Sequence, residues 1–528
     1  MNVPSQDVLI TGARIYTVNS AFDVVEAMVV REGVIIAVGS RESLEHTYTI
    51  DHVVDLKGRM VYPGWIDPHC HFAAYGAQTR EVDFTGAASF EECILRAKAF
   101  PANGKWLTGA GWNHSLWPDA QLPDKTILDR AFPDRPVFMM RADRHCALVN
   151  STALALAGID AQTHVDGGMV EIRDGQPTGI LVDAAMKRMF DCMPVPDPSD
   201  RREALLAAQA ACFGVGLTGV ADAGLDLSDI QLMDQLHREG DLRMNIYAMI
   251  NPNAEAKEFF HTRGPLKTDF LTATSFKYFT DGAIGSHGAW MQQPYLDAPG
   301  NCGLQFYRDE DLLAEAEENL KHGFQMNTHA IGDAANHQVL DIYGRVLKGR
   351  NDKRWRIEHA QVLLPGDIDK FGTFSIIPSV QTTHATSDMP WVESKLGKDR
   401  LVDAYATRRL MMQNGLIANG SDFPVESIDP LKGFYSAVTR QNEKGDPAGG
   451  FMPDERLTRE EALRAMTSWA AYANFDDDRK GSLEPGKFAD FVVTDEDIMR
   501  IPDADIPEVK VYATYIRGQQ VYARENVS

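Results

Sequence analysis

Strand-like and helix-like segments alternate between residues 200 and 420, and this alternation limits the fold more than any other feature of the chain. Seven short apolar runs recur there with helical patterns between them, and an eighth run leads into His69. Because short parallel strands need helical crossovers, the pattern predicts an α/β protein whose eight strands close into a (β/α)8 TIM-like barrel. The seven runs are residues 218–223, 243–250, 275–279, 325–329, 356–359, 375–378 and 416–420.

The composition indicates a large globular protein. The chain has 528 residues, whereas a barrel of this kind takes roughly 250, so accessory domains are expected. A net charge of -23 argues against a nucleic-acid partner. Because no apolar run could span a bilayer and the N-terminus lacks a signal-peptide pattern, we expect a cytoplasmic protein without a membrane partner. The six cysteines are scattered without CxxC spacing and are expected to be reduced thiols.

Short β-rich runs occur at both ends of the chain. Residues 7–60 contain several such runs separated by glycines, and similar runs return at 488–494 and 509–516. Neither end alone has enough strands to bury a sheet face. We therefore expect residues 1–60 and 481–528 to form one small composite β-sandwich domain, with the barrel occupying residues 61–480.

The stretch from residue 75 to residue 195 breaks the alternating pattern, because it is irregular and rich in Trp, Pro and Gly. It contains a hairpin-like segment at 170–180. An insert after the first barrel strand lies over the mouth of the barrel, so we expect an inserted lid subdomain. The barrel pattern then resumes with an amphipathic helix over 201–213, which Asp200 and Glu203 are expected to open as a capping box.

Histidines stand at the ends of several of the predicted strands. On a strand, His69 and His71 point to one face and Cys70 to the other, although the nearby prolines and glycine would also fit an ordinary turn. A barrel gathers the carboxyl ends of its strands at one mouth. A lone histidine at a strand end is more often structural than a ligand, but here six polar side chains converge. They are His69, His71, Lys277, His329, His359 and Asp422.

This ordered set resembles the amidohydrolase superfamily, and more narrowly its amidohydrolase-3 branch, similar to the YtcJ-like metal-dependent hydrolases and the N-substituted formamide deformylases. The resemblance covers nearly the whole chain. The segments that carry it are Pro63 to His71, Gly111-Trp112, Asp143 to Ser151, Lys277 to Gly282, His329 to Asp333, Glu358 to Gln361, His384 with Asp388, Ser421 to Pro424 and Gly481 to Asp490.

The resemblance implies one or two divalent metal ions, with zinc preferred because imidazole and carboxylate are its usual ligands. His69, His71 and Asp422 would hold one ion, and His329 and His359 a second. Since two dications would repel an ammonium group, Lys277 could serve as a ligand only as a carbamate formed with CO2. The alternative is that Lys277 pairs with Asp281 and never contacts metal.

The implied activity is hydrolysis of a C–N bond in an amide, formamide or cyclic amide by a metal-activated hydroxide. Asp422 would transfer the proton, and His145 and His384 would hydrogen-bond the carbonyl or the oxyanion of a small-molecule substrate. Trp112 or Trp117 would either wall an apolar pocket or belong to the core of the insert.

Three alternatives to this function stay open. The same metal centre could run a deamination or the hydrolysis of a lactone or ester. A non-catalytic member could instead use the barrel as a scaffold.

Relatives in the superfamily are often dimers, so a homodimer is a further expectation. His287 stands where the family commonly has an Arg, and it is expected to meet a different substrate group or to add a ligand.

Overall fold

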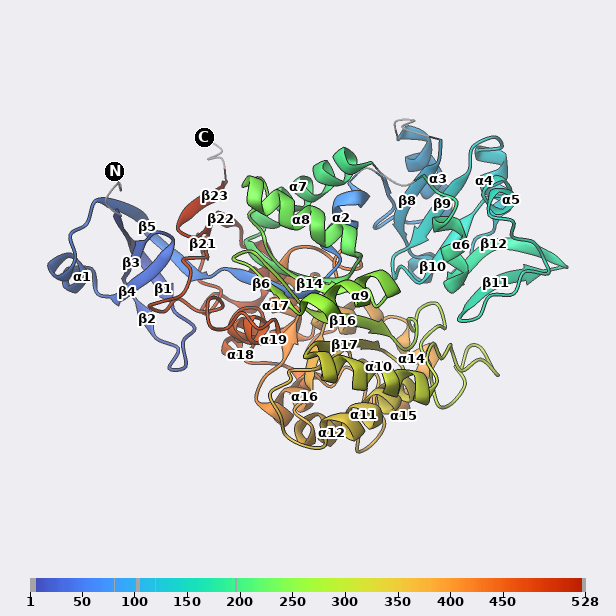
Figure 1. Cartoon of the computed structure of the whole chain (residues 1–528). Coiled ribbons are helices and arrows are strands. Elements are labelled where there is room, and N and C mark those ends of the chain that lie inside the picture. The colour runs from blue at the N-terminus through green and yellow to red at the C-terminus, as the bar shows by residue number, and fades with distance from the viewer. Residues whose placement is uncertain (1–5, 80, 101–104, 119, 195–196, 525–528) are drawn as a thin grey trace.

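The computed structural model describes residues 6–79, 81–100, 105–118, 120–194 and 197–524. Eight parallel strands form the centre of the molecule (Figure 1), which confirms the predicted TIM-like barrel. Their order around the sheet is β20-β19-β18-β17-β16-β14-β13-β6. In chain order the strands are β6 (Trp65–Cys70), β13 (Leu217–Leu225), β14 (Asn245–Ile250), β16 (Leu271–Phe279), β17 (Gln325–Ala330), β18 (Arg356–His359), β19 (Ile377–Val380) and β20 (Ala418–Asn419).

The ring closes where the first strand meets the last. Asp422 N donates to His69 O at 2.8 Å, and His71 N donates to Phe423 O at 2.7 Å. The closure leaves no space for a side chain at Gly420, because a Cβ there would lie 2.6 Å from Asp67 Oδ1 and 2.8 Å from the backbone of His69. The seam of the barrel therefore runs through the predicted ligands.

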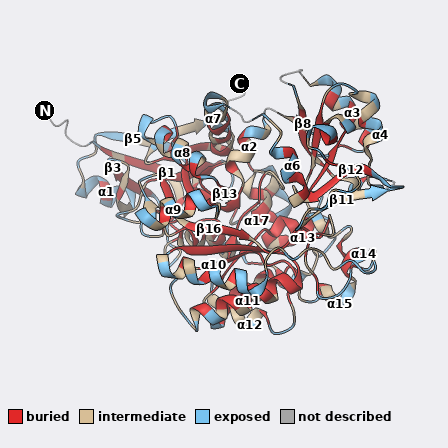
Figure 2. Ribbon diagram, turned by 45° about the vertical axis from the view of Figure 1, so that its right-hand side comes forward, coloured by how far each residue is buried: buried red, intermediate tan, exposed pale blue. Residues whose placement is uncertain are grey.

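Amphipathic helices surround the barrel and bury one face each, as the burial pattern in Figure 2 shows. Examples are α8 (Leu227–Glu239), α10 (Asp309–His322), α11 (Asp333–Leu347) and α17 (Pro430–Thr439). Within the described residues, no helix is both long and apolar enough to cross a membrane.

The helix predicted over 201–213 begins three residues earlier than expected, as α7 (Pro198–Gly214). Asp197, rather than Asp200, is its N-cap, and the Asp197 side chain accepts from Asp200 N at 2.9 Å. The physical reason is Pro198, whose fixed φ suits the first helical position and whose missing N–H costs nothing there.

Strands from the two chain ends form one mixed sheet, and Figure 1 shows them side by side in blue and red. Its order is β23-β22-β21-β5-β1-β3-β4, with β2 (Val24–Val25) paired to β1. The sheet folds over on itself, because Ile35 N on β4 donates to Lys487 O just before β21. The predicted composite β-domain is confirmed. Its strands are β1 (Asp7–Tyr16), β3 (Ala27–Arg31), β4 (Val34–Gly39), β5 (His52–Pro63), β21 (Phe491–Thr494), β22 (Val511–Ile516) and β23 (Gln519–Ala523).

The insert has a six-stranded sheet of its own, in the order β11-β12-β10-β9-β8-β7. The predicted hairpin is present, since Arg173 pairs with Gln176 across the turn. Trp112 and Trp117 are 0% and 5% exposed in the core of this subdomain, so they pack in its interior rather than wall a pocket. The strands are β7 (Val82–Asp83), β8 (Leu107–Trp112), β9 (Val137–Arg141), β10 (Cys146–Val149), β11 (Gly168–Arg173) and β12 (Gln176–Asp183).

Candidate metal centre

His69 and His71 extend from the end of β6 toward the barrel mouth. His69 is fully buried, and its Nδ1 lies 2.5 Å from Glu358 Oε2, which leaves Nε2 directed at the neighbouring ligands. Cys70 points the other way, with its Sγ 3.5 Å from Ala221 O in the barrel wall. The alternation of side chains expected from a strand therefore holds across this segment.

Asp422 follows β20 and completes a first group of three donors. Its Oδ1 lies 3.1 Å from His71 Nε2 and 3.5 Å from His69 Nε2. The residue has a φ of +62°, a left-handed conformation that is rare outside glycine and that recurs at functional sites. Two backbone hydrogen bonds across the barrel seam hold it there.

A second group of donors shares Asp422 and contains His359 and His384. His359 ends β18 with a φ of +73°, and Gln381 Oε1 lies 2.7 Å from its Nδ1. His384 lies on α13 (Thr382–Asp388), directly after β19, with its Nε2 3.7 Å from Asp422 Oδ2. His384, predicted only as a substrate contact, thus joins the ligand-like atoms.

These donors fit a divalent cation. Among the described residues, three of the buried atoms facing one another make no hydrogen bond: His69 Nε2, His384 Nε2 and Asp422 Oδ1. Burial lowers the pKa of His69 to about 4 and that of His359 well below its usual value, so both rings are neutral and able to coordinate. Burial alone would raise the pKa of Asp422, but His71 and His69 hold it well below its ordinary value.

His329 and Lys277 also reach this region. The ring of His329 lies 4.5 Å from that of His359, while its Nε2 lies 3.4 Å from Asp281 Oδ1. Lys277 Nζ is buried and has no hydrogen-bond partner in the described part of the chain. It does not pair with Asp281, whose carboxylate instead accepts from the backbone of residues 331 and 332. The assignment of His329 and Lys277 as ligands stays a prediction.

Glu358 precedes the predicted ligand His359 in the sequence, and in the structure it supports the ligand His69. Its carboxylate binds His69 and also lies 2.7 Å from the Nε of the buried Arg356. Burial would raise the pKa of Glu358, but Arg356 and His69 hold it well below its usual range. An available signal was the Arg-x-Glu spacing on an interior strand, which puts both charges on one face.

Asp67 has a similar supporting position behind the ligands. It accepts from His69 N at 3.1 Å and from Ser421 Oγ at 2.6 Å, so one carboxylate joins the two sides of the barrel seam. Such contacts behind the ligands fix their orientation. The pairing could not be read from the sequence, because 354 residues separate Asp67 from Ser421.

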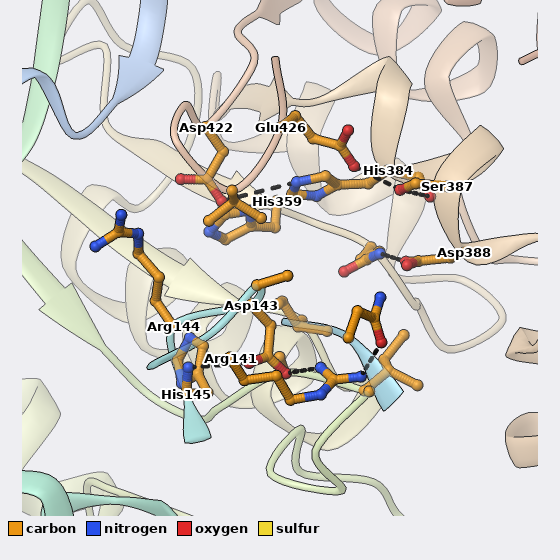
Figure 3. Close-up of a pocket in the computed structure, with 18 of the residues that line it drawn as sticks. Arg141, Asp143, Arg144, His145, His359, His384, Ser387, Asp388, Asp422 and Glu426 are labelled. Carbon is orange, nitrogen blue, oxygen red and sulfur yellow. Dashed lines mark hydrogen bonds and ion pairs between the residues drawn. The ribbon is translucent and has the colours of Figure 1, made fainter. Parts of the chain in front are cut away.

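A cavity of about 400 Å³ opens above the ligands, between the barrel and the insert (Figure 3). His145 comes to it from the insert, with its Nδ1 2.6 Å from Asp183 Oδ1. Burial would lower the pKa of His145, but Asp183 raises it to about 9, so the ring carries a proton at neutral pH. Nothing in the sequence pattern pointed to Asp183. On the same side, Arg141 forms an ion pair with Asp143.

His287 lies outside the ligand groups. Its Nε2 is 3.0 Å from Asp297 Oδ2 and 2.9 Å from Lys395 Nζ, and it lines a neighbouring cavity behind Arg141. Burial lowers its pKa. Both roles expected for His287, contact with a substrate group and addition of a metal ligand, stay predictions.

Residues 52–522 match the pattern of the amidohydrolase family. The chain is 35% identical to Protein LONG AFTER FAR-RED 3 of Arabidopsis thaliana, over 98% of this chain and 91% of that one. It is 32% identical to the YtcJ protein of Bacillus subtilis (strain 168), over 97% and 99%. It is 27% identical to the N-substituted formamide deformylase of Arthrobacter pascens, over 98% and 99%.

A solved structure is similar throughout. The crystal structure of an uncharacterized metal-dependent hydrolase from Pyrococcus horikoshii OT3 superposes with a TM-score of 0.78 at 26% identity, covering 94% of this chain and 99% of that one. The family pattern, the full-length relatives and the His-His-Asp cluster at the barrel mouth agree with the resemblance found in the sequence. The chain belongs to the amidohydrolase family of metal-dependent hydrolases.

Proposed function

We propose that this protein hydrolyses a C–N bond in an amide, a formamide or a cyclic amide. The observation that carries the proposal is the pair of ligand groups sharing Asp422 at the floor of a cavity large enough for a small molecule. The likeness to a formamide deformylase supports a C–N bond over the lactone, ester and deamination alternatives.

His69, His71 and Asp422 would hold one divalent ion, for which we propose zinc because the donors are imidazole and carboxylate. His359 would hold a second ion together with His329 or His384. An ion held there would supply the Lewis acid that activates water and polarises the substrate carbonyl. Glu358 and Asp67 keep the donor atoms in place before an ion arrives.

Two side chains are placed to move or share protons in the reaction. Asp422 is ionised and borders the cavity, so we assign it the transfer of a proton from water to the leaving nitrogen. The Asp183 carboxylate raises the pKa of His145 and so keeps its ring protonated. We assign to His145 the donation of a hydrogen bond to the carbonyl oxygen as negative charge develops on that oxygen. We assign His384 to the same oxygen, with its ligand role as the alternative.

Lys277 is proposed to react with CO2. Its buried Nζ has no hydrogen-bond partner among the described residues, and burial lowers its pKa to about 8. The neutral amine, which is the reactive form, is therefore more abundant than at an exposed lysine. The neutral amine attacks CO2, and formation of the N–C bond releases one proton to give an anionic carbamate that a metal ion could bind.

The test combines metal analysis with a substrate panel. Natively purified protein is assayed for zinc, iron and manganese, and then for turnover of N-formyl amines, N-acyl amines and cyclic amides beside lactones, esters and aminoheterocycles. Bound metal with turnover of the C–N amides is expected. Turnover confined to the lactones, the esters or deamination would refute the proposed bond, and absence of both metal and turnover would favour a scaffold.

The variant Asp422→Asn tests the proton transfer. Because the amide keeps an oxygen donor but cannot accept the proton, turnover should fall by at least about 100-fold. Full wild-type turnover with metal fully bound would overturn the assignment. His384→Asn separates the two roles of that residue, since loss of an ion indicates a ligand and loss of turnover alone indicates a substrate contact.

A further inference from the structure

Arg144 occupies an unusual backbone position at the rim of the cavity. It lies in the turn between β9 and β10 with a φ of +60°. This left-handed conformation costs free energy for any residue with a Cβ, and it is normally given to glycine or asparagine. The backbone of the turn does not require arginine, so the contacts of the side chain must explain why arginine occupies this position.

The guanidinium of Arg144 extends into the cavity without a matching anion. Its Nη2 donates to Gln78 Oε1 at 2.6 Å, and its Nη1 lies 3.7 Å from Met140 Sδ, so both close partners are neutral. No carboxylate of the described residues lies within ion-pair distance. Burial lowers the pKa of Arg144, while Glu81 and Asp422 raise it from farther away.

Arg141, which lines the same cavity, differs from Arg144 because its guanidinium is paired with a carboxylate. Its guanidinium is tied to Asp143, and it also donates to Asn113 Oδ1 at 2.8 Å. Figure 3 shows Arg144 directed away from that pair and toward the side of Asp422. Of the two insert arginines that line the cavity, Arg144 is therefore the one whose charge is available to a ligand.

We propose that Arg144 is a specificity-determining residue that binds a carboxylate on the substrate. The planar guanidinium matches a carboxylate in geometry and charge, and a partly buried cation gains more from such a partner than an exposed one does. This inference rests on the proposed hydrolase function. It narrows the substrate class to amides that carry a carboxylate near the scissile C–N bond, such as N-formyl or N-acyl amino acids.

The alternative is structural, because the bond to Gln78 joins the insert to α2 (Phe72–Gln78). Three variants separate these roles. Arg144→Gly removes the charge, and its turn should form without strain since glycine accepts this φ. Gln78→Ala breaks the same bond while leaving the charge in place. Arg144→Lys keeps a charge but loses the planar fork.

Binding is measured by calorimetry with matched pairs of N-formyl amino acids and their carboxamides, and turnover of the same pairs is measured separately. We expect wild type and Gln78→Ala to prefer the carboxylate by about 10- to 100-fold, the range for a charged hydrogen bond. Arg144→Gly should reduce this ratio of affinities to near one, and Arg144→Lys should give an intermediate ratio. In the turnover assay, the effect of Arg144→Gly should appear mainly in KM.

An equal affinity of wild type for the two members of a pair would overturn the inference. So would a ratio that survives in Arg144→Gly, or one that Gln78→Ala abolishes equally. The binding ratio does not depend on turnover. A preserved ratio without hydrolysis would therefore count against the proposed reaction and in favour of the carboxylate site.

Discussion

The substitution Glu358→Gln tests whether the carboxylate behind His69 holds the metal centre together. Glu358 Oε2 lies 2.5 Å from His69 Nδ1 and 2.9 Å from Arg356 Nη2, and Oε1 lies 2.7 Å from Arg356 Nε. A glutamine keeps one acceptor oxygen and turns an NH2 group toward one of these donors. It also deprives the Arg356 guanidinium of its counter-charge.

The substitution should lower both the free energy of unfolding and the affinity for metal. Breaking a buried ion pair by removing one charge costs about 3–5 kcal/mol, and neither side chain of this pair is exposed. Arg356 keeps hydrogen bonds to Pro68 O and Ser379 Oγ, so we expect the lower end, about 3 kcal/mol. Loss of a partner behind a metal ligand weakens metal binding by about 10- to 100-fold, which is about 1.4–2.8 kcal/mol.

Urea denaturation of the metal-free protein, followed by circular dichroism, measures the free energy of unfolding. Zinc titration of the folded protein measures the metal affinity. The matched control is Glu258→Gln, because Glu258 is exposed on α9 (Ala254–Arg263). Both quantities should be unchanged in the control. If Glu358→Gln also matched wild type in both, the carboxylate would not support the centre and the reasoning would fail.

Three further predictions concern the seam, the lysine and the terminal sheet. Gly420→Ala should destabilise the protein by about 1–3 kcal/mol and weaken metal binding, whereas Gly433→Ala, whose Cβ would meet nothing closer than 3.7 Å, should not lower the melting temperature. Lys277→Ala should lose turnover and regain part of it with added acetate or propionate; failure of rescue with intact metal binding would count against the carbamate. Hydrogen bonds from Arg31 lower the pKa of Asp7, so their stabilisation is full above the unfolded value near 4 and disappears as pH falls through the folded value. The stability deficit of Asp7→Asn should therefore be largest at neutral pH and vanish in acid, as urea denaturation at several pH values would show.

Local patterns in the sequence predicted the barrel strands because strand formation depends on alternation and on turn residues near each strand. The run predicted at 325–329, for example, appears as β17, which ends one residue later. The expectation that His69 and His71 share a face came from the same local rule. The start of α7 was missed because Pro198 outweighed the capping pattern that follows it.

Contacts between residues that are far apart in the sequence could not be predicted from local patterns. His145 is a predicted substrate contact, but Asp183, whose carboxylate raises the pKa of His145, comes from another strand of the insert. His384 joined the ligand-like atoms because α13 starts directly after β19 and points its ring at Asp422. The sequence placed these residues near the mouth, but only the packing of the insert and the loops determines which side chains face each other.

The closure of the barrel determines when the metal site can form during synthesis and folding of the chain. His69 and His71 are synthesised early, and Asp422 arrives only with the last strand, which bonds to the first through the ligand residues themselves. A nascent or truncated chain that lacks Asp422 therefore has the histidines but not the carboxylate that both ligand groups share. Long-range pairings of this kind form late in folding. Binding of metal by the complete ligand set should therefore occur only after the ring has closed, and a chain that stalls before residue 422 would lack this set.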